Sequence, residues 1–303
     1  MKKNPLGKSE LYVSEIGLGT MSLGTDRDKG IALIHEALDN GVNFIDTADL
    51  YDFGLNEEIV GHALEGRRDS AILATKGGNH WEEGKDGWFW DPSKKHIKEA
   101  VKDSLLRLKT DYIDLYQLHG GTIEDPIDET IEAFDELKQE GLIREYGISS
   151  IRPNVIREFV NRSSIATVMM QYSILDRRPE EEILDLLHEN EISVIARGPL
   201  SKGMLTDRYE EKIKEDGFLG YSKYEVLDIS KQLAELKGDH RNITQTALRY
   251  ALAHPAVATA IPGASRSEQL LANLTTQNAP ELTLDEVRKI REISNANKYD
   301  KHR

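Results

Sequence analysis

Cysteine is absent from this 303-residue sequence. Disulfide scaffolds, thiolate nucleophiles and cysteine-ligated metal centres are therefore excluded, and a reducing compartment is compatible with the chain. Positive charge is scarce as well, because 39 Lys and Arg face 53 Asp and Glu and leave a formal net charge of -14. A surface of this sign repels the phosphates of nucleic acids and of anionic membranes, so neither is an expected partner.

Long apolar runs and linkers are also missing. No run approaches the roughly 20 apolar residues of a membrane span, and no apolar segment follows the basic N-terminal residues as in a signal peptide. We therefore expect a cytoplasmic protein. No stretch rich in proline, glycine or serine divides the chain, so a single domain over residues 1–303 is expected. The His-Glu pairs at His35 and His188 lack the second histidine of a zincin helix, and no metal site is indicated.

The sequence does contain a regular alternation of short β-rich runs and longer amphipathic runs. Each β-rich run is followed by a helical pattern, which is typical of a parallel sheet covered by helices. Eight such units favour a closed (β/α)8 TIM barrel over an open sheet. The predicted strands are 16–20, 42–46, 71–75, Ile113–Leu118, 145–148, Thr167–Gln171, 193–196 and Val257–Ile261.

Caps and breakers define the helices between these strands. Ser93 is expected to cap a helix that runs to about Leu108, and Pro153 to open another. An N-terminal β-hairpin at 6–14 and an additional C-terminal helix at 284–294 lie outside the eight units, and 203–239 is expected to be a loop plus a helix. The other predicted helices are 31–40, 57–64, 126–140, 180–189, 244–253 and Ser267–Leu274.

Four polar residues stand at or just behind the carboxyl ends of predicted strands, where barrels of this kind form their active sites. They are Asp46, Tyr51, Lys76 and His119. A tyrosine has an ordinary pKa of about 10, which a nearby lysine ammonium would lower, and an aspartate can keep such a lysine charged in a sheltered site. Any one of the four has an ordinary structural explanation. Together they describe a site that donates a proton to a carbonyl oxygen, with the hydride coming from a cofactor.

The segments around these residues resemble those of the aldo-keto reductases. The resemblance covers 42–51 with Gly54, Asn56, Glu57 and Gly61, then 74–76, 111–119, and 261–265 with Gln269 and Asn273. Within this family, the segments are most similar to those of bacterial members related to the potassium-channel β-subunit branch. It implies a barrel, an NADP(H) cofactor, and reduction of a small-molecule carbonyl substrate or oxidation of an alcohol.

The resemblance also implies roles for individual residues. Tyr51 is the general acid, assisted by Lys76 and Asp46, and His119 orients the carbonyl. An arginine suits the adenosine 2′-phosphate, so Arg266 favours NADP over NAD. Ser149 and Gln171 match the positions that hold the nicotinamide carboxamide, and Pro199, Leu200 and Gly203 match the pyrophosphate loop. The other expected cofactor contacts are Gly19, Thr20, Met21, Asp46, Arg197, Gly198, Gly263, Ser265, Gln269 and Asn273.

The chain departs from the family pattern at two positions. Arg197 stands where many members have an aromatic residue stacked on the nicotinamide, and Ala272 replaces a glutamate, so one adenine contact is expected to be missing. The loop after Lys76 is rich in aromatic residues, and we expect Trp81 and Trp88 to line the substrate pocket. An NADP(H)-binding redox sensor with little turnover, or a barrel hydrolase without a nicotinamide cofactor, remains an alternative. The oligomeric state is left open.

Overall fold

The computed structural model describes residues 1–82, 84, 86–236 and 240–303. Eight parallel strands form one sheet in the order β12-β11-β10-β9-β8-β5-β4-β3. Neighbours in this sheet are also consecutive along the chain. The strands are β3 (Leu18–Gly19), β4 (Phe44–Asp46), β5 (Ile72–Gly77), β8 (Ile113–Leu118), β9 (Ile143–Ser149), β10 (Thr167–Gln171), β11 (Ser193–Arg197) and β12 (Val257–Ile261).

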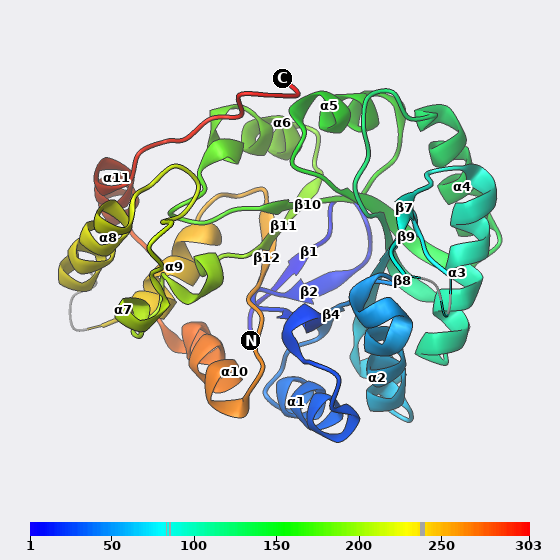
Figure 1. The fold of residues 1–303 in the computed structure, drawn as a ribbon, viewed down its shortest axis with the longest axis horizontal. Coiled ribbons are helices and arrows are strands. Elements are labelled where there is room, and N and C mark those ends of the chain that lie inside the picture. The colour runs from blue at the N-terminus through cyan, green and yellow to red at the C-terminus, as the bar shows by residue number, and fades with distance from the viewer. Residues whose placement is uncertain (83, 85, 237–239) are drawn as a thin grey trace.

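The sheet closes between its first and last strands. Ile16 forms a parallel bridge with Ala260, and Gly19 forms one with Gly263. The N–H of Gly17 donates to the carbonyl oxygen of Ala260 at 2.9 Å. Figure 1 shows the strands inside a ring of helices. The predicted (β/α)8 barrel is therefore confirmed, with a strand at each of the eight predicted places.

The outer helices begin where the sequence supplies a cap. The hydroxyl of Ser93 accepts a hydrogen bond from the N–H of His96 at 3.2 Å, and Pro153 occupies the first turn of its helix. Asn242 and Gln245 form a reciprocal capping box. The barrel helices are α1 (Arg27–Asp39), α2 (Leu55–Leu64), α3 (Lys94–Leu108), α4 (Ile127–Gln139), α5 (Pro153–Arg162), α6 (Ile183–Glu189), α9 (Ile243–Ala251) and α10 (Ser267–Leu274).

A hairpin closes the end of the barrel at which the strands begin. β1 (Lys3–Pro5) pairs antiparallel with β2 (Tyr12–Ser14), which confirms the predicted N-terminal hairpin, although the hairpin begins at Lys3 and not at residue 6. Leu6 and Leu11 belong to the turn, and both are buried. They pack, with Val13, among Phe44, Ala74, Leu115, Met169, Ile195, Ala258 and Ile261.

The elements outside the eight strand–helix units match their predictions in part. The segment predicted at 203–239 holds α7 (Tyr209–Lys212) and α8 (Lys223–Leu236), and its last three residues lie outside the described ones. The predicted C-terminal helix is α11 (Leu284–Ile293), which packs against α8.

Two other predictions need correction. The helix expected at 180–189 is a 3-10 turn (Arg178–Glu181) followed by α6, because Glu182 leaves the helical conformation with φ -160°. The loop expected after Lys76 contains a short antiparallel pair, β6 (Asn79–His80) and β7 (Phe89–Trp90). Isolated two-residue strands carry no periodic pattern, so the sequence could not reveal them.

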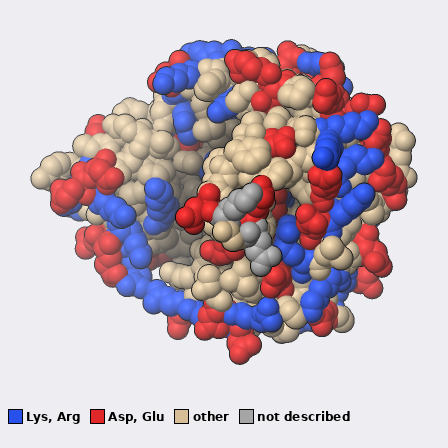
Figure 2. Space-filling model, turned by 45° about the vertical axis from the view of Figure 1, so that its right-hand side comes forward, with Lys and Arg blue, Asp and Glu red and all other residues tan. Residues whose placement is uncertain are grey.

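The surface carries charges of both signs. Figure 2 shows Lys and Arg side chains interspersed with Asp and Glu, on a face that is hollowed near its centre. Among the described residues, no helix is both long and apolar enough to cross a membrane.

Candidate active site

Three adjacent barrel strands bring the predicted catalytic residues to one edge of the sheet. Asp46 is the last residue of β4, Lys76 is the last but one of β5, and His119 directly follows β8. Tyr51 begins a 3-10 turn (Tyr51–Gly54) in the loop behind β4. Because parallel neighbours end at the same edge, the four side chains converge there.

Lys76 is the centre of this group. Its Nζ donates to Oδ2 of Asp46 at 2.7 Å and to the carbonyl oxygen of Thr47 at 2.7 Å, and lies 3.4 Å from the Tyr51 hydroxyl. Burial lowers the pKa of Lys76, but Asp46 and Tyr51 raise it more, so the net shift is upward. Burial raises the pKa of Asp46, and the Lys76 ammonium opposes that shift. Lys76 is therefore a buried ammonium beside a tyrosine hydroxyl.

The backbone turns sharply immediately after Tyr51. Asp52 and Phe53 have left-handed φ values of 48° and 49°, which are costly for residues with a Cβ. Gly54 follows with φ 88°, and a Cβ there would meet the Arg107 side chain at 2.7 Å. Glycine is thus required at position 54 by both conformation and space. The strained turn holds the Tyr51 ring at the mouth of the barrel, half-buried.

His119 faces Tyr51 edge to face, with ring centroids 5.9 Å apart. Within the described residues, its buried Nδ1 atom has no hydrogen-bond partner. Burial, with the charges of Lys76 and Arg197, lowers the pKa of His119 to about 3. The imidazole is consequently neutral in the physiological range, and it can donate a hydrogen bond without competing as an acid.

A buried amide below this group was not assigned a role from the sequence. Oδ1 of Asn56 lies 2.5 Å from Oγ1 of Thr20 and 2.8 Å from Oγ1 of Thr47, and its Nδ2 donates to the carbonyl oxygen of Thr20 at 3.0 Å. Since the Thr47 carbonyl binds Lys76, Asn56 helps to fix a partner of the ammonium. The only signal in the sequence was its place in the segment that resembles the family motif.

A second supporting group surrounds Glu57, which is fully buried. Its carboxylate accepts from the Thr75 hydroxyl at 2.6 Å and from Nε of Arg107 at 2.7 Å. Thr75 precedes Lys76 in β5, so this group ties the catalytic strand to α2 and α3. Sequence reasoning could not find it, because α2, β5 and α3 meet only in the folded barrel.

The remaining strand ends carry the residues expected to hold a cofactor. Ser149, Gln171 and Arg197 are the last residues of β9, β10 and β11. Nη1 of Arg197 lies 3.4 Å from Oε1 of Gln171, so these two expected contacts touch each other. Gly198, Pro199, Leu200 and Gly203 follow in the loop after β11, where Gly198 and Gly203 have φ 63° and 90°.

The start of α10 and the end of β3 complete this half of the rim. Ser265 donates through its N–H and its hydroxyl to Oε1 of Gln269 at 3.0 Å. Arg266 is exposed at the N-cap of α10, and Asn273 is buried inside that helix. Across from them lie Gly19, which bridges to Gly263, and then Thr20 and the exposed Met21.

Comparison with known proteins agrees with this geometry. The model of the aldo/keto reductase family matches residues 15–295. The chain belongs to the aldo/keto reductase family. It is 56% identical to an uncharacterized oxidoreductase, YqkF, of Bacillus subtilis, with both chains covered completely. It is 34% identical to the NADH-specific methylglyoxal reductase of Escherichia coli, over 92% of this chain and 94% of that one.

A solved structure is similar over the same extent. The holo form of aldo-keto reductase AKR11C1 from Bacillus halodurans superposes with a TM-score of 0.94 at 56% identity, covering 100% of this chain and 99% of that one. The predicted family and fold are thereby confirmed. The likeness to the channel β-subunit branch and the roles of individual residues stay predictions.

The two tryptophans expected in the pocket of this aldo/keto reductase differ in their surroundings. Trp81 is half-buried and meets Phe53 edge to face, with centroids 5.7 Å apart, while the Arg107 guanidinium lies 5.5 Å from its ring. It therefore borders the turn that carries Tyr51. Trp88 is 53% exposed at the other side of the same hairpin. Of the two, only Trp81 contacts the turn that follows Tyr51.

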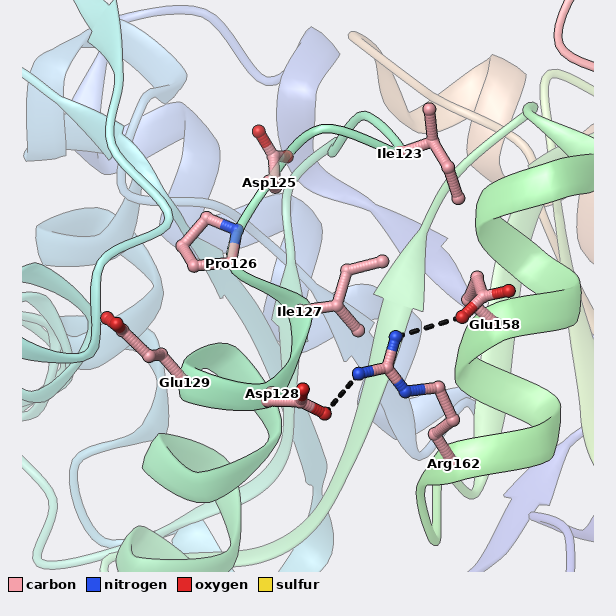
Figure 3. Close-up of a pocket in the computed structure, with 8 residues that line it drawn as sticks. All are labelled: Ile123, Asp125, Pro126, Ile127, Asp128, Glu129, Glu158 and Arg162. Carbon is pink, nitrogen blue, oxygen red and sulfur yellow. Dashed lines mark hydrogen bonds and ion pairs between the residues drawn. The ribbon is translucent and has the colours of Figure 1, made fainter.

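An open pocket of the protein lies elsewhere. It opens between the start of α4 and the C-terminal half of α5, where Arg162, the last residue of α5, pairs with Asp128 and Glu158 (Figure 3). None of the four converging residues lines it. Its rim is acidic and its one arginine is already paired, so it offers no site for the cofactor's phosphates.

Proposed function

We propose that the protein reduces aldehydes or ketones to alcohols, with Tyr51 as the proton donor and NADPH as the hydride source. The observation that carries this proposal is the 3.4 Å separation between the Tyr51 hydroxyl and a lysine ammonium that a buried aspartate keeps charged. A phenolate left by proton donation is stabilised by that ammonium. This setting suits Tyr51 to act as the general acid.

The other residues around Tyr51 have separate roles in this proposal. Asp46 acts through Lys76, since it has no contact with the tyrosine hydroxyl among the described hydrogen bonds. Neutral His119 is suited to donate a hydrogen bond to the substrate carbonyl and to align it with Tyr51. Trp81 supplies an apolar wall beside the Tyr51 turn. Small carbonyl compounds with an apolar side are the substrate class that fits.

The residues present fit a nicotinamide dinucleotide. When bound, the nicotinamide supplies the hydride. Ser149 and Gln171 offer a hydroxyl and an amide for its carboxamide, and the positive-φ Gly198 leaves the loop backbone open to phosphates, with only Gln171 within 4 Å of a Cβ added there. In the described part of the chain, the Arg266 guanidinium has no hydrogen-bond or ion-pair partner and is free for an adenosine 2′-phosphate.

Arg266 therefore makes NADP(H) our choice, although the Escherichia coli relative is named as NADH-specific. Comparing kcat/KM for NADPH and NADH tests this. Arg266→Gln should reduce the preference for NADPH at least about 10-fold and leave NADH turnover unchanged, because a charge-assisted pair contributes about 1.5–3 kcal/mol. Preference for NADH in the unaltered protein would overturn the choice of cofactor and leave the chemistry intact.

The decisive experiment follows NADPH oxidation with a panel of aldehydes. Tyr51→Phe keeps the ring and removes the proton, so turnover should fall about 100- to 10,000-fold while NADPH still binds. Tyr224→Phe, at a residue 77% exposed on α8, is the matched control and should be fully active. Binding of NADPH without turnover by the unaltered protein, across a broad panel, would favour a redox sensor.

A further inference from the structure

Two histidines and an aspartate meet beside the active site, in a place that the sequence did not single out. His80 lies in β6, Asp91 directly follows β7, and His96 is in the first turn of α3. Their potential ligand atoms all lie within 4.8 Å of one another. They come from three elements at a spacing that matches no linear metal motif, so only the fold brings them together.

The first pair is already arranged as two ligands of one ion. Nδ1 of His80 lies 3.4 Å from Oδ2 of Asp91. A tetrahedral Zn²⁺ with bonds of about 2.0–2.1 Å separates its ligand atoms by about 3.3 Å. The other carboxylate oxygen, Oδ1, accepts from the N–H of Ser93 at 3.1 Å, which orients the group. Such support from outside the ligand set is typical of metal sites.

The histidine rings are also held in place. His80 is stacked between Phe89 and His96, with centroids 4.6 Å apart on each side. Nε2 of His96 is buried and has no hydrogen-bond partner among the described residues. An unpartnered ring nitrogen of this kind is available as a metal ligand, since neutral imidazole binds metal ions through either ring nitrogen.

We propose that His80, Asp91 and His96 bind a divalent transition-metal ion of the Zn²⁺ type, with water at the fourth position. Two imidazole nitrogens and one carboxylate oxygen are a ligand set for such ions, whereas Mg²⁺ and Ca²⁺ prefer oxygen alone. Binding the ion requires the ligand atoms, which lie within 4.8 Å of one another, to move closer together around it. The unpartnered Nε2 thereby gains a partner, which most buried polar atoms in folded proteins have.

The ion joins the β6–β7 hairpin to α3. The same hairpin carries Trp81, which packs against Phe53 in the Tyr51 turn. The metal site is therefore placed to stabilise the substrate side of the active site from outside it. It takes no part in the proposed proton transfer.

Calorimetric titration of the untagged, chelator-treated full chain with ZnCl₂ tests the proposal without any activity measurement. We expect one Zn²⁺ per chain. His80→Gln and His96→Gln should each weaken binding at least about 100-fold, since altering even a supporting residue costs 10- to 100-fold. His188→Gln, an exposed histidine on α6, should bind as the unaltered chain does. NADPH binding and circular dichroism check that each variant is folded.

Cobalt gives an independent signature. Co²⁺ bound by the unaltered chain should show the visible absorption of a tetrahedral ion, and Asp91→Asn should reduce it. Absence of a 1:1 isotherm at micromolar Zn²⁺, or equal affinity in His80→Gln, His96→Gln and His188→Gln, would overturn the site. Either result leaves the proposed role of Tyr51 unaffected, because that role is tested by the rate of NADPH oxidation and not by metal binding.

Discussion

Nζ of Lys76 lies 2.7 Å from Oδ2 of Asp46, and each side chain is at most 2% exposed. Neither charge is stable at this depth without the other, because removing one partner leaves an uncompensated charge in a weakly polarisable interior. The pair therefore links stability to catalysis. Asp46 keeps the ammonium in place, and the ammonium acts on Tyr51.

Lys76→Met is expected to destabilise the fold by about 3–5 kcal/mol and to abolish measurable aldehyde reduction. The first effect arises from the unpaired Asp46, and the second from the missing charge beside Tyr51. Urea unfolding and NADPH oxidation separate the two. In the double variant Asp46→Asn with Lys76→Met, most of the stability should return while the activity does not. Recovery of activity in the double variant would contradict the role given to Lys76.

The strand-end residues of this site could be predicted from sequence because they follow short, strongly apolar strands. Asp46, Lys76 and His119 each stand at the end of a run whose residues are buried in the barrel. Barrel topology then places such residues together, whatever lies between them. Ser93 and Pro153 marked helix starts for a similar reason, since caps act within one turn of the chain.

Features that depend on contacts distant in the sequence could not be predicted. Leu6 and Leu11 lie in the turn of the N-terminal hairpin, and their burial inside the barrel follows only from the packing of that hairpin on the strands. The support that Asn56 gives to Thr47, and the cluster of His80 with His96, arise only when separate elements pack. Burial decides these roles, and a single sequence does not report burial.

The second prediction concerns pH and His119. In the unfolded chain a histidine titrates at about 6.5, whereas in the fold burial and nearby cations lower the pKa of His119 to about 3. Between these values the unfolded state binds a proton that the native state does not. This contribution to stability is complete above about pH 6.5 and is lost as the pH falls toward 3.

Urea unfolding at several pH values measures the effect. The unaltered chain should lose about 2 kcal/mol more than His119→Gln between pH 7 and pH 5, at 1.36 kcal/mol per pKa unit. Other titrating groups contribute equally to both proteins and cancel in the comparison. Parallel stability curves for the two proteins would show that His119 is not held neutral by the fold.

The third prediction separates the two tryptophans. Trp81 contacts the turn of Tyr51 through Phe53, and Trp88 is largely exposed. Trp81→Ala should raise KM for aldehydes about 10-fold, since losing an apolar wall costs about 1–3 kcal/mol. Trp88→Ala should change KM less than twofold. Steady-state kinetics with one aldehyde at saturating NADPH measures both KM values. An equal change in KM for the two variants would mean that Trp81 does not line the substrate pocket.

The last prediction rests on Gly77, which follows Lys76 in β5. A Cβ at this position would lie 2.0 Å from the hydroxyl oxygen of Tyr116 and 3.0 Å from its ring carbon Cζ. The Tyr116 hydroxyl is buried and makes no hydrogen bond within the described part of the chain. Gly77→Ala should therefore destabilise the protein by at least about 2 kcal/mol, and Tyr116→Phe should be neutral or stabilising.

Combining Gly77→Ala with Tyr116→Phe should recover part of the lost stability, because the oxygen that clashes is gone while Cζ remains. A double-mutant cycle in urea measures this coupling. Strictly additive effects would mean that Gly77 is needed for its backbone conformation rather than for the space that Tyr116 occupies.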